Sequence, residues 1–204
     1  MPADPVEAES YRILRSRLDM SGLPPLSRAV TERVIYATAD FGYVTDLVCY
    51  EPALAAALGA LRRAAPLVAD GPTVASGITG YPVICTAGDS LAARLARTAS
   101  ISVSAAAVRL AFSAAGPGAV WLVGSAPAAL WEIMAREGEP ALVIGVPVGL
   151  VGAAEAKHAL RRSGLPSLSN LSEKGGAPVA VAAFEALLRM AAGPAPGPEE
   201  ESRA

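Results

Sequence analysis

The sequence has few of the residues on which several common functions depend. It contains one histidine and two cysteines, only 5% of its residues are aromatic, and its formal charge is −2. Without an excess of basic residues the chain cannot neutralise many phosphates, and it has few aromatic rings on which bases could stack. These absences argue against a nucleic-acid-binding protein.

The scarcity of histidine and cysteine also argues against metal and disulfide chemistry. Cys49 and Cys85 are far apart in the sequence and have no histidine nearby, so we expect two buried thiols and assign neither a metal nor a disulfide. The histidine, His158, falls near the basic end of a predicted helix in Lys157-His-Ala-Leu-Arg-Arg. We expect it on the surface, which makes a catalytic triad built on it an unfavoured reading.

Long apolar runs are missing too, although 52% of the residues are hydrophobic. The longest uncharged apolar run, 141–154, contains Pro147 and three glycines, so it is too short and too broken to cross a bilayer. The first residues, Met1-Pro-Ala-Asp-Pro, lack the basic and then apolar order of a signal peptide. We therefore expect a cytoplasmic protein that does not bind a membrane.

What the chain does contain is an alternation of short apolar runs with helical patterns. The apolar runs predict five strands, at 66–69, 81–85, 119–123, 141–145 and 167–169. Helical patterns separate them, at about 88–98, 104–114, 126–137, 152–163 and 177–191, and the N-terminal third adds helices near 6–18, 27–38 and 51–64. This alternation predicts an α/β fold, a three-layer α/β/α sandwich with a mainly parallel five-stranded sheet.

Two boundaries follow from local composition. Residues 1–192 are expected to form a single domain, whereas 193–204 are rich in proline and glutamate and predict a disordered tail. Ser27 is expected to be the N-cap of the helix near 27–38, because Thr31, Val34 and Ile35 then share one helical stripe.

In a sheet of this kind a ligand binds beyond the carboxyl ends of the strands. Asp70 directly follows a predicted strand, and Asp40 ends a helical pattern, so each is a candidate for substrate contact or, equally, for helix capping and holding a loop. Glycine turns at 123–127, 145–152 and 174–176 could present N–H groups to an anion, or only allow tight turns. Arg109 could bind an anionic ligand, or form a surface salt bridge.

Several segments, taken in order, resemble the precorrin-8X methylmutase (precorrin isomerase) family. They are Glu9-Ser-Tyr-Arg-Ile-Leu, Arg33-Val-Ile-Tyr-Ala-Thr-Ala-Asp40, Pro66-Leu-Val-Ala-Asp-Gly, Ser104-Ala-Ala-Ala-Val-Arg109, Val123-Gly-Ser-Ala-Pro, Ile144-Gly-Val-Pro-Val-Gly-Leu-Val-Gly-Ala-Ala-Glu-Ala-Lys157 and Lys174-Gly-Gly176. The matching segments extend from about residue 7 to residue 188, and the stretch 144–157 is the most specific.

This resemblance implies an α/β homodimer that binds a modified tetrapyrrole in cobalamin biosynthesis. Such an isomerase moves a methyl group between neighbouring ring carbons to give hydrogenobyrinate, a formal [1,5]-sigmatropic shift that needs neither a metal nor an organic cofactor. The family has a catalytic histidine, thought to protonate the macrocycle, where this chain has Tyr36. Phenol is a weaker acid than imidazolium by about 3.5 pKa units, which would cost about 50-fold in rate.

The chain departs from the family at two further places. The family has an arginine where this chain has Val103, and basic residues where it has 171–173, which end in Glu173. By motif position we assign Tyr36 as the catalytic residue and predict the following substrate-binding residues: Arg12, Thr38, Asp40, Asp70, Ser104, Arg109 and Lys174.

The departures leave two alternatives to the family reaction. One is a repurposed isomerase or cyclase that acts on a less anionic substrate in specialised metabolism, and the other is a catalytically inactive binding protein.

Overall fold

The computed structural model describes residues 5–136 and 138–193. Within these ranges six strands form one sheet, in the order β1-β6-β5-β4-β2-β3. The strands are β1 (Leu47–Cys49), β2 (Leu67–Ala69), β3 (Val83–Ile84), β4 (Val120–Val123), β5 (Leu142–Gly145) and β6 (Ser167–Asn170). All neighbouring pairs are parallel except β1 with β6, which is antiparallel.

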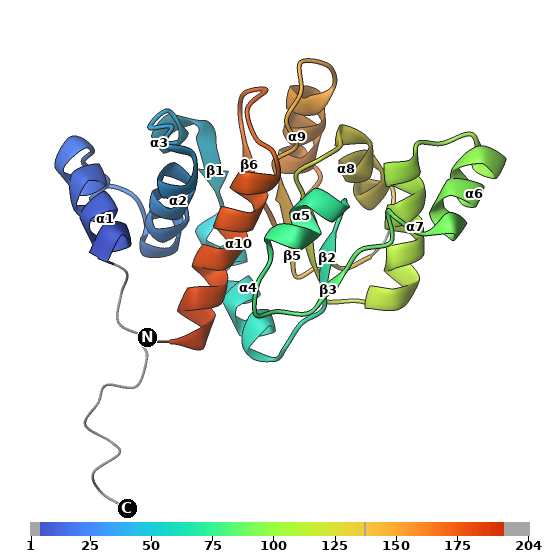
Figure 1. The fold of residues 1–204 in the computed structure, drawn as a ribbon, viewed down its shortest axis with the longest axis horizontal. Helices are drawn as coiled ribbons and strands as arrows, with labels where there is room; N and C mark the ends of the chain where they lie inside the picture. The colour runs from blue at the N-terminus through green and yellow to red at the C-terminus, as the bar shows by residue number, and fades with distance from the viewer. Residues whose placement is uncertain (1–4, 137, 194–204) are drawn as a thin grey trace, which may run out of the picture.

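Helices flank the sheet on both faces (Figure 1). They are α1 (Pro5–Arg17), α2 (Pro25–Thr38), α3 (Tyr43–Asp46), α4 (Glu51–Arg62), α5 (Pro72–Gly77), α6 (Ser90–Ala99), α7 (Val103–Ala115), α8 (Pro127–Met134), α9 (Ala153–Arg162) and α10 (Ala177–Ala192). Residues of α2, α4 and α10 pack in one core cluster, and residues of α7, α8 and α9 pack in the other. The three-layer arrangement is therefore confirmed.

The two core clusters lie on opposite faces of the sheet because side chains alternate along each strand. In β4, Val120 and Leu122 belong to the cluster under α4 and α10, whereas Trp121 and Val123 belong to the cluster under α7 and α8. Every residue of β2, β4 and β5 is buried. Strands buried on both faces account for the near-continuous apolar runs of the sequence.

The sequence prediction was incomplete for the strands and wrong for one helix cap. The prediction gave five strands, and the sixth, β1, was missed because it has only three partly buried residues. The helix α2 begins at Pro25 with Pro24 as its N-cap, so Ser27 is not the cap. Ser27 is buried inside the helix, where its hydroxyl donates a hydrogen bond to Glu51 at 2.5 Å.

Further predictions concerned the cysteines, the histidine, membrane-spanning segments and the C-terminal tail. Cys49 and Cys85 are free thiols, but they are partly rather than fully buried. His158 is exposed, as expected. No single helix of the described residues is long and apolar enough to span a membrane, and α6 and α7, which pass that test only together, are bent by 116°. The tail predicted at 193–204 lies outside the described residues from 194 onward.

Candidate functional site

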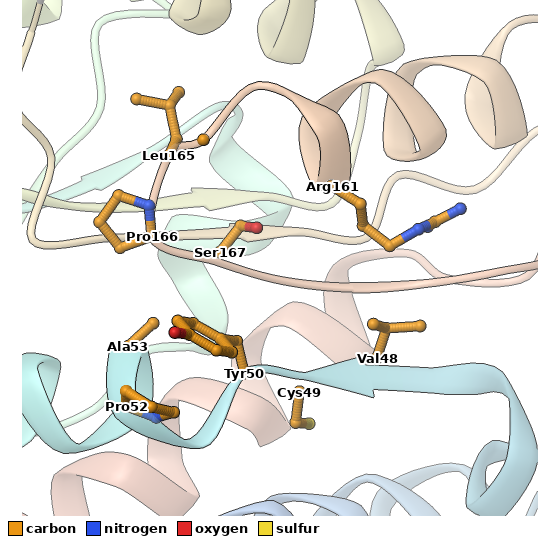
Figure 2. Close-up of a pocket in the computed structure, with 10 residues that line it drawn as sticks. Val48, Cys49, Tyr50, Pro52, Ala53, Arg161, Leu165, Pro166 and Ser167 are labelled. Carbon is orange, nitrogen blue, oxygen red and sulfur yellow. The ribbon is translucent and has the colours of Figure 1, made fainter.

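A cavity lies at the antiparallel edge of the sheet. It has a volume of about 590 Å³ and is bounded by β1 and the start of α4 on one side and by the α9–β6 connection on the other. Figure 2 shows that its walls are mainly apolar and that the guanidinium of Arg161 points away from Tyr50 and Pro166. That guanidinium donates to Ser169 Oγ and to the carbonyl oxygen of Asn170. The cavity contains none of the predicted site residues.

Three of the predicted residues, Asp40, Asp70 and Lys174, lie instead near the edge of the sheet where the parallel strands end. The strand β2 pairs with β3 on one side and β4 on the other, so the chain reverses its direction across the sheet between β2 and β4. In open α/β sheets this switch point is where ligands usually bind. Here Asp70, the residue after β2, occupies it.

The carboxylate of Asp70 is buried and accepts three backbone hydrogen bonds. The donors are the N–H groups of Gly124 (3.2 Å), Ser125 (2.7 Å) and Ala126 (3.0 Å), in the turn between β4 and α8. Burial raises the pKa of Asp70 above its ordinary value, although these N–H groups oppose that shift. The turn at 123–127 is therefore an anion site, as its glycine suggested, but the anion it holds is a side chain of the same protein.

The second loop at this edge, 171–176 between β6 and α10, is held by three buried polar side chains from three elements. Asp46, at the end of α3, accepts hydrogen bonds from the backbone N–H groups of Leu171 and Ser172, from Ser172 Oγ and from Asn170 Nδ2. Lys157, on α9, donates to Asn170 Oδ1 and to the backbone carbonyls of Ser172 and Lys174.

Lys157 was not among the predicted site residues, but the sequence contains a signal for it. It lies on the stripe of α9 that also contains Ala153, Ala156 and Leu160, all of which are buried. A lysine on the apolar stripe of a helix must find acceptors inside the protein, because an unpaired buried ammonium is costly. Its exposed fraction is 0%, and burial lowers its pKa to about 8.

The structure brings together two of the predicted residues, Asp40 and Lys174. The ammonium of Lys174 lies 2.8 Å from Asp40 Oδ2, and the other carboxylate oxygen accepts the N–H of Gly42. These hydrogen bonds lower the pKa of Asp40, and the Asp40 carboxylate raises the pKa of Lys174. Thr38, the last residue of α2, accepts the N–H of Asp40 through its hydroxyl.

Tyr36 lies on the same helix but faces α1. Its ring stacks on Tyr11, with centroids 5.3 Å apart and an interplanar angle of 9°, and the guanidinium of Arg33 lies 4.9 Å from its centroid. It lines a depression of about 200 Å³ together with Ile13, Phe41 and neighbouring residues. Within residues 5–136 and 138–193 its hydroxyl has no hydrogen-bond partner.

Three predicted residues are not brought to this group by the single chain. Arg12 is exposed on α1 and pairs with Glu9 of the same helix. Arg109 pairs with Glu132 of α8, which is the surface salt bridge considered as its alternative. Ser104 is at the start of α7, and Figure 1 shows α7 at the opposite end of the molecule from α1 and α2.

An exposed apolar loop completes this edge of the sheet. The β5–α9 connection contains Val148, Leu150 and Val151, with exposed fractions of 51%, 93% and 89%, and Leu171 in the next loop is 51% exposed. The two loops are joined by a hydrogen bond from the N–H of Gly149 to the carbonyl of Glu173. Apolar side chains so exposed favour contact with a ligand or with another chain.

Three comparisons with known proteins agree with one another. Residues 5–190 match the family model described as Precorrin-8X methylmutase. The chain is 35% identical over 195 residues to the cobalt-precorrin-8 methylmutase of Salmonella typhimurium, covering 90% of this chain and 93% of that protein. It is 36% identical over 191 residues to the protein of the same name from Methanothermobacter thermautotrophicus, covering 91% and 92%.

The structural comparison gives the same result. The fold is similar to the crystal structure of the precorrin-8x methyl mutase from Thermus thermophilus, with a TM-score of 0.84 and 33% sequence identity. The similarity covers 92% of this chain and 95% of that one.

Proposed function

The chain belongs to the precorrin-8X methylmutase family, and we propose that it catalyses methyl migration on a corrin-ring precursor, giving hydrogenobyrinate in cobalamin biosynthesis. The observation that carries this proposal is the similarity, over nearly the whole chain, to methylmutases whose sequences and fold it shares. The reaction is an isomerisation, because the methyl group leaves one ring carbon and bonds to a neighbouring one within the same molecule.

We assign the role of hydrogen-bond donor to Tyr36. Its hydroxyl is free of partners within the described ranges, so the donor is available, and the contacts of its ring with Tyr11 and Arg33 restrict the direction of that donor. A phenol remains neutral at pH 7 and can donate a hydrogen bond to a ring nitrogen or carbonyl oxygen of the macrocycle. This stabilises charge that develops on the macrocycle as the methyl group moves.

The other polar residues assigned to the site suit a substrate with several carboxylates. Lys174 presents an exposed ammonium that a substrate carboxylate can share with or take over from Asp40. Thr38 holds the end of α2, and Arg12 on α1 provides a further exposed cation. Ser104 and Arg109, on α7, remain proposed contacts by motif position, and Asp70 contributes by fixing the β4–α8 turn.

The comparisons do not favour the two alternatives to the family reaction. The two curated relatives carry the name methylmutase, and neither name indicates an activity in specialised metabolism or a non-catalytic role. Val103 and Glu173 still distinguish this chain from the family pattern. We attribute to them a changed affinity for carboxylates rather than a changed reaction.

The test is turnover of the macrocycle by the wild type and two variants of Tyr36. We expect the wild type to convert precorrin-8X or cobalt-precorrin-8, Tyr36→Phe to lose most of this activity, and Tyr36→His to be faster by up to about 50-fold. Absorbance of the product measures all three, as hydrogenobyrinate when the substrate is precorrin-8X and as the cobalt-containing isomer when it is cobalt-precorrin-8. Absence of turnover by both the wild type and Tyr36→His would contradict the proposed function.

We also propose that the protein is a cytoplasmic homodimer. The exposed apolar residues Val148, Leu150 and Val151 support a second copy as a partner, and the free thiols of Cys49 and Cys85 are compatible with a reducing compartment. Light scattering at micromolar concentration measures the oligomeric state. A species with the mass of one chain would contradict it.

A further inference from the structure

We propose that Lys157 is a positioning residue of the site, which acts through Lys174 by fixing the conformation of the loop 171–176. The inference rests on the proposed function for what Lys174 binds, but not for how the loop is held. It adds a residue that does not itself reach the surface where a substrate would bind.

The three hydrogen-bond acceptors of Lys157 all lie in one short segment, 170–174. They are Asn170 Oδ1 at 3.0 Å, the carbonyl of Ser172, and the carbonyl of Lys174 at 2.7 Å. An ammonium has three N–H donors. The side chain is therefore fully used by the loop that follows β6.

The N–H groups and the carbonyls of the loop bind different side chains, and the carbonyls of Ser172 and Lys174 accept from Asn170 Nδ2 as well as from Lys157. Asp46 accepts the N–H groups of Leu171 and Ser172, whereas Lys157 binds the carbonyls of Ser172 and Lys174. Asn170 joins the two, because its amide donates to Asp46 and its oxygen accepts from Lys157. Together these contacts define the path of the loop up to Lys174.

After Lys174, the backbone of the loop packs closely against Val146. Gly175 has φ +145°, and a Cβ atom there would lie 2.1 Å from the carbonyl oxygen of Val146. The N–H of Gly176 donates to that same oxygen at 2.8 Å. With its carbonyl bound by Lys157 and the following backbone against Val146, Lys174 directs its side chain outward to Asp40.

An apolar side chain would fill the same space on α9 without placing a charge in the interior. Replacing a whole buried ion pair with apolar residues of similar volume is often neutral or stabilising in proteins, so buried charges are not needed for stability as such. The ammonium of Lys157 therefore has a use beyond stability of the core, and its contacts indicate that this use is the geometry of the loop.

The first experiment measures the loop directly, by hydrogen exchange of the ligand-free protein. The variant is Lys157→Met, and the matched control is Leu160→Ala, which disturbs the buried stripe of the same helix without removing a hydrogen bond to the loop. We expect Lys157→Met to speed exchange of the 171–176 amides by about 10-fold or more, with β4 and β5 unchanged. Leu160→Ala should leave the ratio of loop exchange to strand exchange as in the wild type.

The second experiment asks whether the effect reaches a ligand through Lys174. Binding of hydrogenobyrinate is titrated by absorbance for the wild type, Lys157→Met, Lys174→Met and the double variant. We expect Lys157→Met to weaken binding by about 10-fold when Lys174 is present and to have no effect in the Lys174→Met background. If Lys157→Met does not fold, Lys157→Gln, which keeps two N–H donors, replaces it in both experiments.

The outcomes separate this inference from the proposed function. Unchanged loop exchange in the Lys157 variant, exchange that rises equally throughout the protein, or equal weakening of binding in both backgrounds would overturn the positioning role. Failure of the wild type to bind hydrogenobyrinate, together with selectively faster loop exchange in the variant, would overturn the proposed function and leave the positioning role supported.

Discussion

Two loops at the carboxyl edge of the sheet are held by different sets of buried charges: a carboxylate alone holds one, and a carboxylate together with an ammonium holds the other. The β4–α8 turn directs three consecutive N–H groups inward, and one carboxylate, Asp70, accepts all of them. In the 171–176 loop, N–H groups of Leu171 and Ser172 donate to Asp46, and the carbonyls of Ser172 and Lys174 accept from the ammonium of Lys157. The direction of the backbone groups thus determines which buried charge a loop needs.

The comparison also explains why the two carboxylates have opposite pKa shifts. Burial raises the pKa of Asp70, and its three N–H donors do not compensate. Burial opposes ionisation of Asp46 too, but hydrogen bonds from Asn170 and Ser172 outweigh it and lower the pKa below the ordinary 3.8. Hydrogen bonds from the side chains of Asn170 and Ser172 therefore favour the charged form of Asp46, whereas burial disfavours the charged form of Asp70.

The largest effect is expected for Asp46→Ala. The substitution removes four hydrogen bonds to a buried carboxylate. It leaves the N–H and the hydroxyl of Ser172 without their acceptor, whereas Leu171 N–H keeps the backbone carbonyl of Asp46 and Asn170 Nδ2 keeps the carbonyls of Ser172 and Lys174. Removing one member of a buried charged network costs about 3–5 kcal/mol of unfolding free energy. Urea unfolding followed by circular dichroism measures the loss. Asp19→Ala is the control, because Asp19 is an exposed carboxylate that accepts only a local N–H from Ser21; a similar loss in both variants would contradict the importance of the network.

A smaller effect is expected for Asp70→Asn. The amide keeps one oxygen for the N–H groups of the turn and removes a charge that burial already disfavours, so we expect a loss of about 1–2 kcal/mol. Asp46→Asn, in which a favourable charge is lost, should cost more. Urea unfolding of the two Asn variants measures both losses of unfolding free energy. A larger loss for Asp70→Asn than for Asp46→Asn would contradict the difference between the two carboxylates.

The pH dependence of these variants should have opposite signs. Asp46 has a lowered pKa, so its contribution to stability is present above about pH 4 and is lost as the pH falls through its folded value. Asp70 has a raised pKa, so the folded protein binds the extra proton above about pH 4, and its contribution increases as the pH falls. The difference in unfolding free energy between the wild type and each of Asp46→Asn and Asp70→Asn, measured from pH 3 to pH 7, should slope in opposite directions for the two variants. Parallel slopes would contradict the assigned shifts.

The smallest effect on stability is expected for the exposed pair of Asp40 and Lys174. The pair is open to solvent, and ion pairs of this kind contribute little. Lys174→Met should leave the midpoint of urea unfolding unchanged while it weakens binding of hydrogenobyrinate. A clear loss of stability would mean that Lys174 holds the loop rather than being held by it.

Sequence patterns were sufficient for the central strands, because β2, β4 and β5 are buried on both faces and appear as uninterrupted apolar runs. They were not sufficient for β1, whose partly buried residues show no such pattern and whose existence depends on pairing Val48 with Ser169. Similarly, α3 has four residues, too few for a helical period to be detected.

Motif positions were sufficient to assign candidate site residues, but not to predict which side chains those residues contact in the fold. Asp40 and Lys174 were both assigned, but their ion pair joins residues 134 positions apart. Tyr36 was assigned from its motif, whereas its stacking on Tyr11 follows from the packing of α1 on α2. For Asp70 the sequence left ligand contact and loop holding open, and the geometry of the three N–H groups shows the second.

The pairing of β1 with β6 has a consequence for the order in which the chain folds. The carboxylate of Asp46 accepts the N–H of Ser172, which lies 126 residues later in the chain. Synthesis proceeds at about 5–20 residues per second, so roughly 6–25 s pass between the emergence of these two residues. During this time β1 has no strand beside it and Asp46 has none of its donors from the last strand. We therefore expect the antiparallel edge, and with it the 171–176 loop, to form late in co-translational folding, after the parallel strands have docked.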